Sequence, residues 1–273
     1  MRIDQLLVQR QLASSRSQAQ RLIADGLEFL HDGAWRRCSK NGEEVPEQAE
    51  LRLISQAEAR YVSRGGLKLE AGLRAMDWSV QDLQCLDVGQ STGGFTDCLL
   101  QAGARRVVGV DVGSGQLHPR LREDWRVVCI EKCNARNLSA AELTRGYLAA
   151  LPAHSDVETA AVGAPFSPAF DLVVIDVSFI SQTLLLPSLV PFFKPGGRLL
   201  SLVKPQFELQ PGEVGKRGIV REPSLHAKVE KRLRDCCAML GLSWLRWLDS
   251  PIAGGDGNRE FLLAAQRPAT AVA

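Results

Sequence analysis

The start of the chain combines two short helical patterns with a small sheet. Apolar residues recur at i, i+3 and i+4 spacing in residues 3–7 and again in residues 19–23, which predicts two amphipathic helices. The dipeptide Asp32-Gly33, which follows, is typical of a β-hairpin turn. These features predict a small α+β domain, to which we assign residues 1–58.

From Leu83 onward the pattern changes to short, largely apolar runs that are mostly separated by helix-length stretches. This alternation is typical of a doubly wound α/β sheet. A helical stripe over residues 69–76 precedes the first run, so a second domain is assigned to residues 66–268, after a linker over residues 59–65. Residues 151–169 are rich in Ala and Pro without a clear period, which predicts an insertion loop with no chemistry of its own. The expected strands cover residues 83–86, 107–110, 127–130, 172–175 and 199–203.

The composition is that of an ordinary globular protein, since 45% of the 273 residues are hydrophobic, 23% are charged and the net charge is +2. This balance alone does not indicate a nucleic-acid partner. The charge is uneven along the chain, however: residues 1–21 hold four arginines and one acid, and residues 213–234 hold seven Lys or Arg and three acids. We interpret these two stretches as candidate phosphate-facing surfaces.

The cysteines and histidines indicate neither a metal site nor a redox site. The seven cysteines include no C-x-x-C pair, because Cys129/Cys133 and the adjacent Cys236/Cys237 have other spacings, and the four histidines are scattered. Reduced thiols and no bound metal are expected. No basic-then-apolar signal segment opens the chain, and the longest apolar runs are too short for a membrane span. We therefore expect a cytoplasmic protein without a membrane partner.

A glycine-rich turn follows the first expected strand of the second domain. The segment Asp87-Val-Gly-Gln-Ser-Thr-Gly-Gly-Phe95 leads into a helix-length stretch, and its glycines allow close approach of a ligand. Asp111 ends the next strand, where a carboxylate can accept hydrogen bonds from both hydroxyls of a ribose. The G-x-x-x-G-G spacing differs from the G-x-G-x-x-G turn that binds a pyrophosphate, which favours a nucleoside cofactor without phosphate, such as S-adenosylmethionine. The expected cofactor contacts are Asp87, Gly89, Ser91, Gly93, Gly94, Phe95, Asp111 and, at the adenine edge, Asn134.

Four charged residues are expected near the same edge of the sheet. Asp176 and Lys204 each follow an expected strand, and the carboxyl ends of parallel strands line the ligand-binding edge of an open sheet. We therefore expect these two side chains side by side, beneath the bound cofactor. Lys68 begins the helix that precedes the sheet, and Glu260 begins the last apolar run. One such residue alone is typical of a solvated surface group, but two lysines and two acids together indicate a catalytic set.

This set suits methyl transfer to a hydroxyl, which requires that the hydroxyl lose its proton as it attacks the methyl group in line. A lysine accepts that proton only in its neutral form. A neighbouring ammonium, a sulfonium charge and burial favour neutral Lys204, whereas Asp176 and Glu260 favour its charged form and orient it. The hypothesis is that Lys204 accepts the proton, while Asp176, Glu260 and Lys68 position and tune it.

Six segments in this order resemble those of the TlyA-type rRNA methyltransferases, whose catalytic domain is similar to that of FtsJ. They are Ser63-Arg-Gly-Gly-Leu-Lys68-Leu, Asp87-Val-Gly-Gln-Ser-Thr-Gly-Gly-Phe-Thr-Asp97, Val110-Asp-Val-Gly-Ser-Gly-Gln-Leu117, Asp176-Val-Ser-Phe-Ile180, Val203-Lys-Pro-Gln-Phe-Glu208 and Asn258-Arg-Glu-Phe261. The resemblance covers essentially the whole chain and implies a Rossmann-like domain that uses S-adenosylmethionine. It implies methyl transfer to a ribose 2′-hydroxyl of a cytidine in large-subunit rRNA, and in some members also in small-subunit rRNA. It also implies a Lys-Asp-Lys-Glu tetrad at the four positions of the catalytic set.

Residues 1–54 resemble the small RNA-binding fold shared by ribosomal small-subunit protein four and pseudouridine synthases. The segments that carry this resemblance are Arg2-Ile-Asp-Gln-Leu-Leu7, Ser15-Arg-Ser-Gln-Ala19 and Leu22-Ile-Ala-Asp-Gly26. It implies that arginines of this domain meet the RNA backbone and position it rather than read its sequence. In the second domain, we interpret the loop after Lys204 as a flexible RNA clamp. The expected RNA contacts are Arg2, Arg10, Arg16, Arg21, Arg64, Lys216, Arg217 and Arg221.

Three features depart from the family pattern, one of which is that the insertion over residues 151–169 is longer than the family needs. Glu28-Phe-Leu-His-Asp-Gly33 stands where the RNA-binding fold usually has a V-x-V-N-G hairpin, and Gln90 stands where the cofactor turn usually has a small residue.

Three other functional classes stay open at this point. A nicotinamide oxidoreductase shares the glycine turn and the acidic strand end but does not need Lys204. A pseudouridine synthase shares the N-terminal domain, yet its catalytic aspartate belongs to a mostly antiparallel fold that this pattern does not indicate. Some relatives carry a haemolysin label, but the chain has no long basic amphipathic helix for membrane lysis. The sequence also leaves open the modified nucleotide, naked rRNA or an assembled ribosomal subunit as substrate, and a monomer or a homodimer.

Overall fold

The computed structural model describes residues 1–13, 15–38, 40–53, 60–151, 166–215, 218–254 and 257–269. The chain forms two compact units, Met1–Leu67 and Lys68–Ala273. The second unit thus begins at Lys68, against an expected start of the second domain at residue 66. The end of the expected first domain, at residue 58, and most of the expected insertion, residues 151–169, lie outside the described residues.

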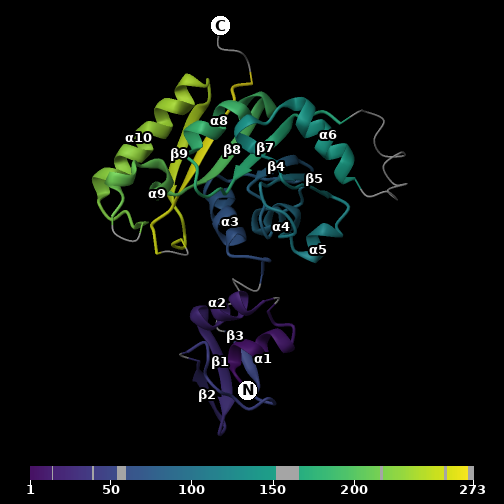
Figure 1. Cartoon of the computed structure of the whole chain (residues 1–273), viewed down its shortest axis with the longest axis vertical. Helices are drawn as coiled ribbons and strands as arrows, with labels where there is room; N and C mark the ends of the chain where they lie inside the picture. The colour runs from purple at the N-terminus through teal and green to yellow at the C-terminus, as the bar shows by residue number, and fades with distance from the viewer. Residues whose placement is uncertain are drawn as a thin grey trace. The chain divides into compact units, whose positions relative to one another are not determined.

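The first unit packs two helices against a three-stranded antiparallel sheet (Figure 1). The β1–β2 hairpin turns at Asp32 and Gly33, whose φ angles of 52° and 74° are the left-handed values that a two-residue hairpin turn requires. Apolar residues of both helices form one core with Leu27 and Phe29 of the central strand. The elements are α1 (Ile3–Gln9), α2 (Arg16–Gly26), β1 (Leu27–His31), β2 (Ala34–Arg37) and β3 (Leu51–Leu53), in the sheet order β2-β1-β3.

The second unit is built on a seven-stranded sheet in the order β6-β5-β4-β7-β8-β10-β9. The first five strands of this order are parallel, whereas β10 runs antiparallel to both of its neighbours. The strands are β4 (Gln84–Val88), β5 (Arg106–Val110), β6 (Val127–Ile130), β7 (Phe170–Ile175), β8 (Phe193–Val203), β9 (Ser243–Asp249) and β10 (Phe261–Gln266).

Helices cover both faces of this sheet. In Figure 1, α6, α8 and α10 lie along one side of the strands, and α3, α4 and α5 lie along the other. The two-residue alternation of strands explains this arrangement: Leu199 and Leu263 belong to the core that α6, α8 and α10 share, whereas the neighbouring Leu200 and Leu262 face Gly72 of α3. The helices are α3 (Gly65–Ala75), α4 (Gly94–Gln101), α5 (Pro119–Arg122), α6 (Ala140–Ala150), α8 (Gln182–Leu189), α9 (Pro205–Glu208) and α10 (Pro223–Met239), with 3₁₀ turns at Ala135–Asn137, Val190–Phe192 and Pro211–Glu213.

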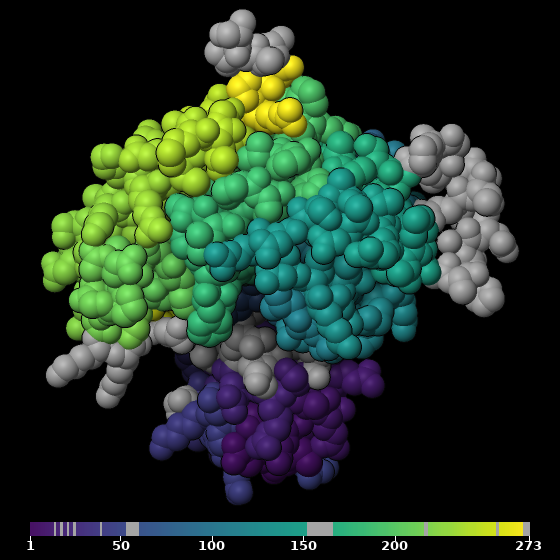
Figure 2. Space-filling model, turned by 45° about the horizontal axis from the view of Figure 1, so that its top comes forward, coloured from purple at the N-terminus to yellow at the C-terminus, as the bar shows by residue number. Residues whose placement is uncertain are grey.

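The expected α/β class is confirmed, and each apolar run predicted to be a strand is one. The sequence pattern missed β9, because its residues Ser-Trp-Leu-Arg-Trp-Leu-Asp form neither an apolar run nor a strict alternation. It also missed the direction of β10, since periodicity carries no information on strand direction. The space-filling view in Figure 2 shows the teal, green and yellow parts of the second unit packed against one another. None of the described helices is long and apolar enough to cross a membrane.

Candidate active site

Strand register brings three of the four expected catalytic residues to one edge of the sheet. Asp176 and Lys204 follow the last residues of β7 and β8, which are parallel neighbours. Strand β10 is antiparallel to β8, with Phe261 opposite Val203. One residue further along this register, Glu260 comes opposite Lys204. The carboxyl ends of β7 and β8, together with the start of β10, therefore deliver two carboxylates and one ammonium to the same edge.

Lys204 and Asp176 form an ion pair in which Nζ lies 2.6 Å from Oδ1. The two side chains are therefore side by side, as their places at neighbouring strand ends predict. The same ammonium donates a hydrogen bond to Oγ of Ser178 at 3.1 Å. The side chains of Lys204 and Asp176 are 13% and 24% exposed, so a ligand can still reach the pair. An ion pair and a hydrogen bond, both to one loop, hold the lysine in one orientation, which proton transfer requires.

Lys68 and Glu260 form a second ion pair, which is more deeply buried. Nζ of Lys68 lies 2.5 Å from Oε2 of Glu260, and the side chains are only 9% and 3% exposed. Two charges removed from water this far are tolerated because they neutralise each other at hydrogen-bond distance. Gly254 leaves the space for this pair, since a Cβ there would lie 2.6 Å from Oε1 of Glu260. The four predicted residues thus form two pairs, one partly open to solvent and one closed.

A glycine sets the position of helix α3, which carries Lys68. A Cβ on Gly72 would lie 2.7 Å from Leu200 of β8 and 3.2 Å from Leu262 of β10. The bare glycine therefore allows the helix to approach the sheet closely. Lys68, one turn earlier, reaches Glu260 at the start of β10 for this reason.

The glycine turn between β4 and α4 lies against the loop that carries Asp176. Gly89 and Gly93 have φ angles of 84° and 93°, which glycine adopts without strain. A Cβ on Gly89 would overlap the backbone carbonyl oxygen of Asp176, and a Cβ on Gly93 would overlap Leu121 of α5. Helix α4 begins at Gly94 without a side-chain cap. The backbone N–H of Thr96 hydrogen-bonds Asp87, so the N–H groups of Gly94 and Phe95 can bind an anionic group, such as the carboxylate of an amino acid.

Asp111 lies at the end of β5, beside the glycine turn. Its two carboxylate oxygens accept the backbone N–H groups of Ser91 and Gly113, each at 2.7 Å. The side chain is half-buried, so it can also accept hydroxyl groups from solvent or from a ligand. This arrangement fits a ribose at the strand end, as the sequence predicts.

Asp87 lies beneath the turn, in a buried chain of hydrogen bonds. Gln90 donates its amide N–H to Oγ1 of Thr96 at 2.9 Å, and Thr96 donates its hydroxyl to Oδ2 of Asp87 at 2.6 Å. The carboxyl of Asp87 has no exposed surface. Burial, followed by the nearby charge of Asp176, raises the pKa of Asp87 to about 7. Gln90, which departs from the family pattern, therefore supports the turn through this hydrogen bond. Its side-chain amide packs directly on Gly109 of β5, where a Cβ would overlap it.

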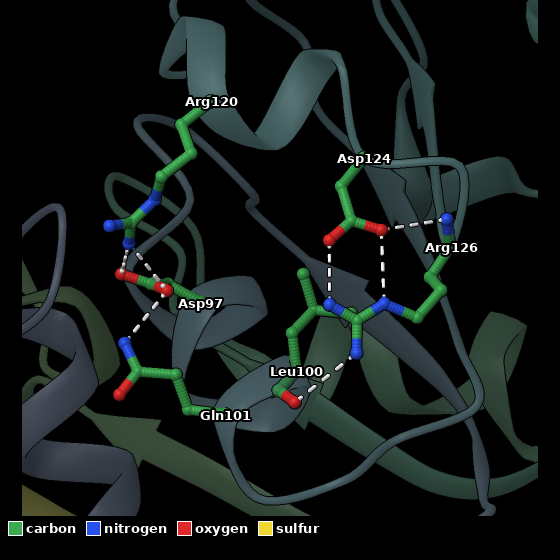
Figure 3. Close-up of polar contacts among 6 residues, drawn as sticks. All are labelled: Asp97, Leu100, Gln101, Arg120, Asp124 and Arg126. Atoms are coloured by element: carbon green, nitrogen blue, oxygen red, sulfur yellow. Dashed lines mark hydrogen bonds and ion pairs between the residues drawn. The ribbon is translucent and has the colours of Figure 1, made fainter.

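Two ion pairs fix α4 to the elements around it (Figure 3). Asp97, in the first turn of α4, accepts two hydrogen bonds from Arg120 of α5, at 2.8 and 2.9 Å, and one from the side chain of Gln101 at 3.0 Å. Asp124 and Arg126 form a bidentate pair at 2.6 and 3.0 Å, and Arg126 also donates to the carbonyl of Leu100 at 3.5 Å. Helix α5 is thereby held against Gly93, which keeps the glycine turn in shape.

The remaining expected cofactor contacts differ in exposure. Ser91 is exposed on the turn with a φ of 48°, whereas Phe95 is 3% exposed and packs in the core. Asn134 is exposed after β6 and caps the next 3₁₀ turn, where it accepts the backbone N–H of Arg136 at 3.0 Å. The side chain of Phe95 therefore supports α4.

Three arginines expected to bind RNA make contacts inside the first unit. Arg2 and Arg16 lie 2.9 and 3.3 Å from a carboxylate oxygen of Asp4. The hydrogen bond from Arg2 lowers the pKa of Asp4. Arg10 donates to the backbone carbonyls of Ala49, at 2.8 Å, and of Glu47. These contacts give the three side chains a structural role that their position on an amphipathic helix did not indicate. The side chain of Arg21 lies outside the described part of the chain.

Acids neutralise several of the cations in the basic stretch after Lys204. Lys216 and Arg217 lie outside the described residues, whereas Arg221 is exposed. Three of the four Lys and Arg residues of α10 form ion pairs with acids: Lys228 with Glu213, Lys231 with Asp235 and Arg234 with Glu230. The fourth, Arg232, donates to the backbone carbonyl of Glu208 at 2.6 Å. The described part of the loop is anchored rather than free, because Asn258 accepts the backbone N–H of Val220 and donates to the carbonyl of Gly218, both at 2.9 Å. Arg64, the remaining expected RNA contact, is half-buried just before α3.

Phe179 is a residue of the site that sequence reasoning missed. It follows Asp176 by three positions, is 89% exposed and has a φ of 66°, which is unusual for a bulky side chain. Its ring packs against Phe207 of α9, with ring centroids 5.0 Å apart. An exposed aromatic ring beside the Lys204–Asp176 pair offers a flat surface on which a base can stack. Its place in the Asp176-Val-Ser-Phe segment is the one signal that could have revealed it.

Comparison with known proteins adds family relationships to this geometry. The sequence profile of the FtsJ-like methyltransferases matches residues 61–267, and that of the S4 domain matches residues 1–27. The YqxC protein of Bacillus subtilis, described as a candidate rRNA methyltransferase, is 43% identical over 267 residues, which are 98% of this chain and 86% of that protein.

Two further relatives cover nearly the whole chain. The 16S/23S rRNA (cytidine-2′-O)-methyltransferase TlyA of Mycobacterium tuberculosis is 38% identical over 262 residues, or 96% of this chain and 88% of that protein. A solved structure from Streptococcus thermophilus, described as a candidate hemolysin, is 38% identical with a TM-score of 0.70 and covers 98% of this chain and 88% of its own.

Proposed function

The chain belongs to the FtsJ-like methyltransferase family, as a TlyA-type member that begins with an S4 domain, and on this premise we propose that it transfers a methyl group from S-adenosylmethionine to the ribose 2′-hydroxyl of a cytidine in ribosomal RNA. The observation that carries this proposal is the Lys204–Asp176 pair, with Nζ and Oδ1 2.6 Å apart beside the glycine turn. An oxidoreductase that uses a nicotinamide has no need of such a pair.

The residues around the glycine turn fit S-adenosylmethionine. Asp111 would hold the ribose hydroxyls, and Asn134 would lie near the adenine, since both follow neighbouring strands of the sheet. The uncapped N-terminus of α4 would hold the carboxylate of the methionine part. When bound, the cofactor supplies an electrophilic methyl group on a positively charged sulfur.

Lys204 is proposed to accept the proton of the 2′-hydroxyl. Asp176 and Ser178 hold its Nζ at 2.6 and 3.1 Å, so the amine points to one place while the hydroxyl attacks. A positive charge brought near Lys204 by the cofactor favours release of the lysine proton before the reaction. The buried Lys68–Glu260 pair fixes the start of β10. Because this pair has no net charge, the electrostatic environment of Lys204 is set by Asp176.

Phe179 is proposed to stack on the base of the target nucleotide. A cytidine whose ribose meets Lys204 must leave its helical stack, and an exposed aromatic side chain compensates for the lost base stacking. Phe207 supports the ring from behind. A Phe179→Ala variant should lower kcat/KM for RNA at least tenfold and leave S-adenosylmethionine affinity unchanged in calorimetry; an unchanged kcat/KM would contradict this role.

The sheet of the first unit offers a better RNA surface than the arginines of its helices. Trp35, Arg37 and Arg52 lie on the face that points away from the core, because they pair across the sheet with Leu30 and Glu28. The guanidinium of Arg52 lies 4.3 Å from the centre of the Trp35 ring. Aromatic rings flanked by arginines are typical of surfaces that bind single-stranded RNA. Trp35→Ala should weaken rRNA binding without changing kcat, whereas equal binding would exclude this face.

Mass spectrometry of rRNA nucleosides tests the proposed function in cells. Cells that contain the protein should yield 2′-O-methylcytidine at a site that is unmodified in cells without it. Re-expression of the intact chain should restore the modification, and re-expression of the Lys204→Ala variant should not. Identical nucleoside profiles with and without the protein would refute the proposal.

A further inference from the structure

Glu208 is a buried carboxylate that the four catalytic residues do not explain. It is 3% exposed and ends α9, the short helix that starts directly after Lys204. Burial raises its pKa, and hydrogen bonds from Gln182 and Ser181 oppose this shift. A buried carboxylate is costly unless its oxygens accept hydrogen bonds. The hydrogen bonds from Ser181 and Gln182 therefore compensate for the burial of Glu208.

Both carboxylate oxygens of Glu208 bind the start of helix α8. Ser181 donates its hydroxyl to Oε2 at 2.5 Å, and Gln182 donates its backbone N–H to Oε1 at 2.8 Å. Ser181 is the N-cap residue of α8. A negative charge at this helix end also interacts favourably with the helix dipole. Glu208 thus completes the cap of a helix that begins at the end of the loop carrying Asp176.

Gln182 extends this network into strand β8. Its amide N–H donates to the carbonyl of Leu202, and its amide oxygen accepts the hydroxyl of Ser201, both at 2.7 Å. Ser181, Gln182, Ser201 and Glu208 are all 9% exposed or less. Buried hydrogen bonds among groups this shielded from water hold their elements rigidly. The loop after β7 is therefore tied to β8 just before Lys204 and to α9 just after it.

We propose that Glu208 is a positioning residue for the methyl transfer. It holds the loop of residues 176–181 against α9, so that Asp176 and Ser178 stay in contact with Nζ of Lys204. The rings of Phe179 and Phe207, tilted by 47° and with centroids 5.0 Å apart, are in contact across the same junction. This inference rests on the proposed function, since it assigns Glu208 to the reaction of the Lys204–Asp176 pair.

Two substitutions of different severity test the proposal. Glu208→Gln keeps the shape and can still accept the N–H of Gln182, but it presents an amide to the hydroxyl of Ser181. Glu208→Ala removes both contacts. The expected kcat for rRNA methylation falls roughly tenfold in the first variant and roughly a hundredfold in the second, because small misplacements of reacting groups have effects of this size. KM for S-adenosylmethionine should stay within about twofold in both.

Asp171→Asn is the matched control. Asp171 also joins two elements through a backbone N–H, that of Gln84 at 2.9 Å, and pairs with Lys194 at 2.8 Å. It lies in the same strand, β7, but at the opposite end from Asp176. This variant should keep the kcat of the original chain. If the kcat of Asp171→Asn fell as much as that of Glu208→Gln, the effect would be a general loss of stability. This result would overturn the positioning role of Glu208.

Amide hydrogen exchange of residues 177–183, measured without substrate, gives a readout independent of activity. Exchange there should be at least tenfold faster in Glu208→Gln than in the original chain, and unchanged in Asp171→Asn. Unchanged exchange, or a wild-type kcat in Glu208→Gln, would refute the inference on Glu208. An original chain that methylates no rRNA would instead refute the proposed function, while the exchange result would still decide whether Glu208 holds the loop. If Glu208→Ala does not fold, the comparison of Glu208→Gln with Asp171→Asn decides alone.

Discussion

Replacing Lys68 by methionine tests the different environments of the two ion pairs. Methionine keeps most of the length of the side chain but removes the ammonium, so Glu260 stays 3% exposed without the cation that lies 2.5 Å away. Removal of one partner from a buried pair costs roughly 3–5 kcal/mol. The same substitution at Lys204 leaves Asp176, whose side chain is 24% exposed against 3% for Glu260, so the expected cost is smaller.

Urea unfolding followed by tryptophan fluorescence measures this difference. Four of the five tryptophans belong to the second unit, so the signal reports mainly on the domain that contains both pairs. Lys68→Met should unfold at clearly lower urea than Lys204→Met, although both should lose methyl transfer. The double variant Lys68→Met/Glu260→Gln carries no unpaired charge and should recover at least about 2 kcal/mol relative to Lys68→Met. Equal stability of the two single variants, or no recovery in the double variant, would show that this reading of the buried pair is wrong.

Three further predictions concern residues outside the tetrad. Because burial raises the pKa of Asp87 to about 7 from an ordinary 3.8, the folded chain binds a proton that the unfolded chain has released between roughly pH 4 and pH 7. The free energy of unfolding should therefore rise as the pH falls through this window, by up to about 4 kcal/mol. The test compares the stability of Asp87→Asn with that of the original chain at pH 5 and at pH 8. A difference that is the same at both pH values would contradict this prediction. Gly89→Ala should weaken S-adenosylmethionine binding more than tenfold in calorimetry, since its Cβ overlaps the carbonyl of Asp176 and the φ of 84° is strained for alanine; affinity within twofold would count against this geometry. Arg10→Ala should lower the stability of the first unit by roughly 1–2 kcal/mol and leave the salt dependence of RNA binding unchanged, whereas a flatter salt dependence would place Arg10 on the RNA surface.

The sheet and the Lys204–Asp176 pair could be predicted from the sequence for the same physical reason. Apolar runs mark buried parallel strands, and the residue after such a strand lies at the ligand-binding edge of the sheet. Asp176 and Lys204 each follow an apolar run, so their adjacency follows once β7 and β8 are neighbours. The way the tetrad divides into pairs could not be predicted, because it depends on the antiparallel register of β10 and on the close approach of α3 at Gly72.

Other features of the site depend on burial, which charged residues do not reveal in a sequence. Glu208 belongs to a polar stretch and looks like an exposed acid, yet it is 3% exposed and caps another helix. Arg2 and Arg10 look like phosphate-binding residues, yet they hold a carboxylate and two carbonyl groups inside their own unit. Phe179 looks like a core residue and is almost fully exposed. For Glu208, Arg10 and Phe179, contacts with residues far away in the sequence determine the role of the side chain.

Methylation of rRNA by purified Lys204→Ala, compared with the original chain, tests directly whether Lys204 accepts the proton of the 2′-hydroxyl. Radiolabelled methyl transfer and S-adenosylmethionine binding would be measured on the same preparations. Lys204→Ala should bind the cofactor with an affinity within about threefold of the original chain and transfer methyl groups at least a thousandfold more slowly, the scale expected when a positioned acid–base group is lost. Transfer by Lys204→Ala at the original rate would contradict this role of Lys204.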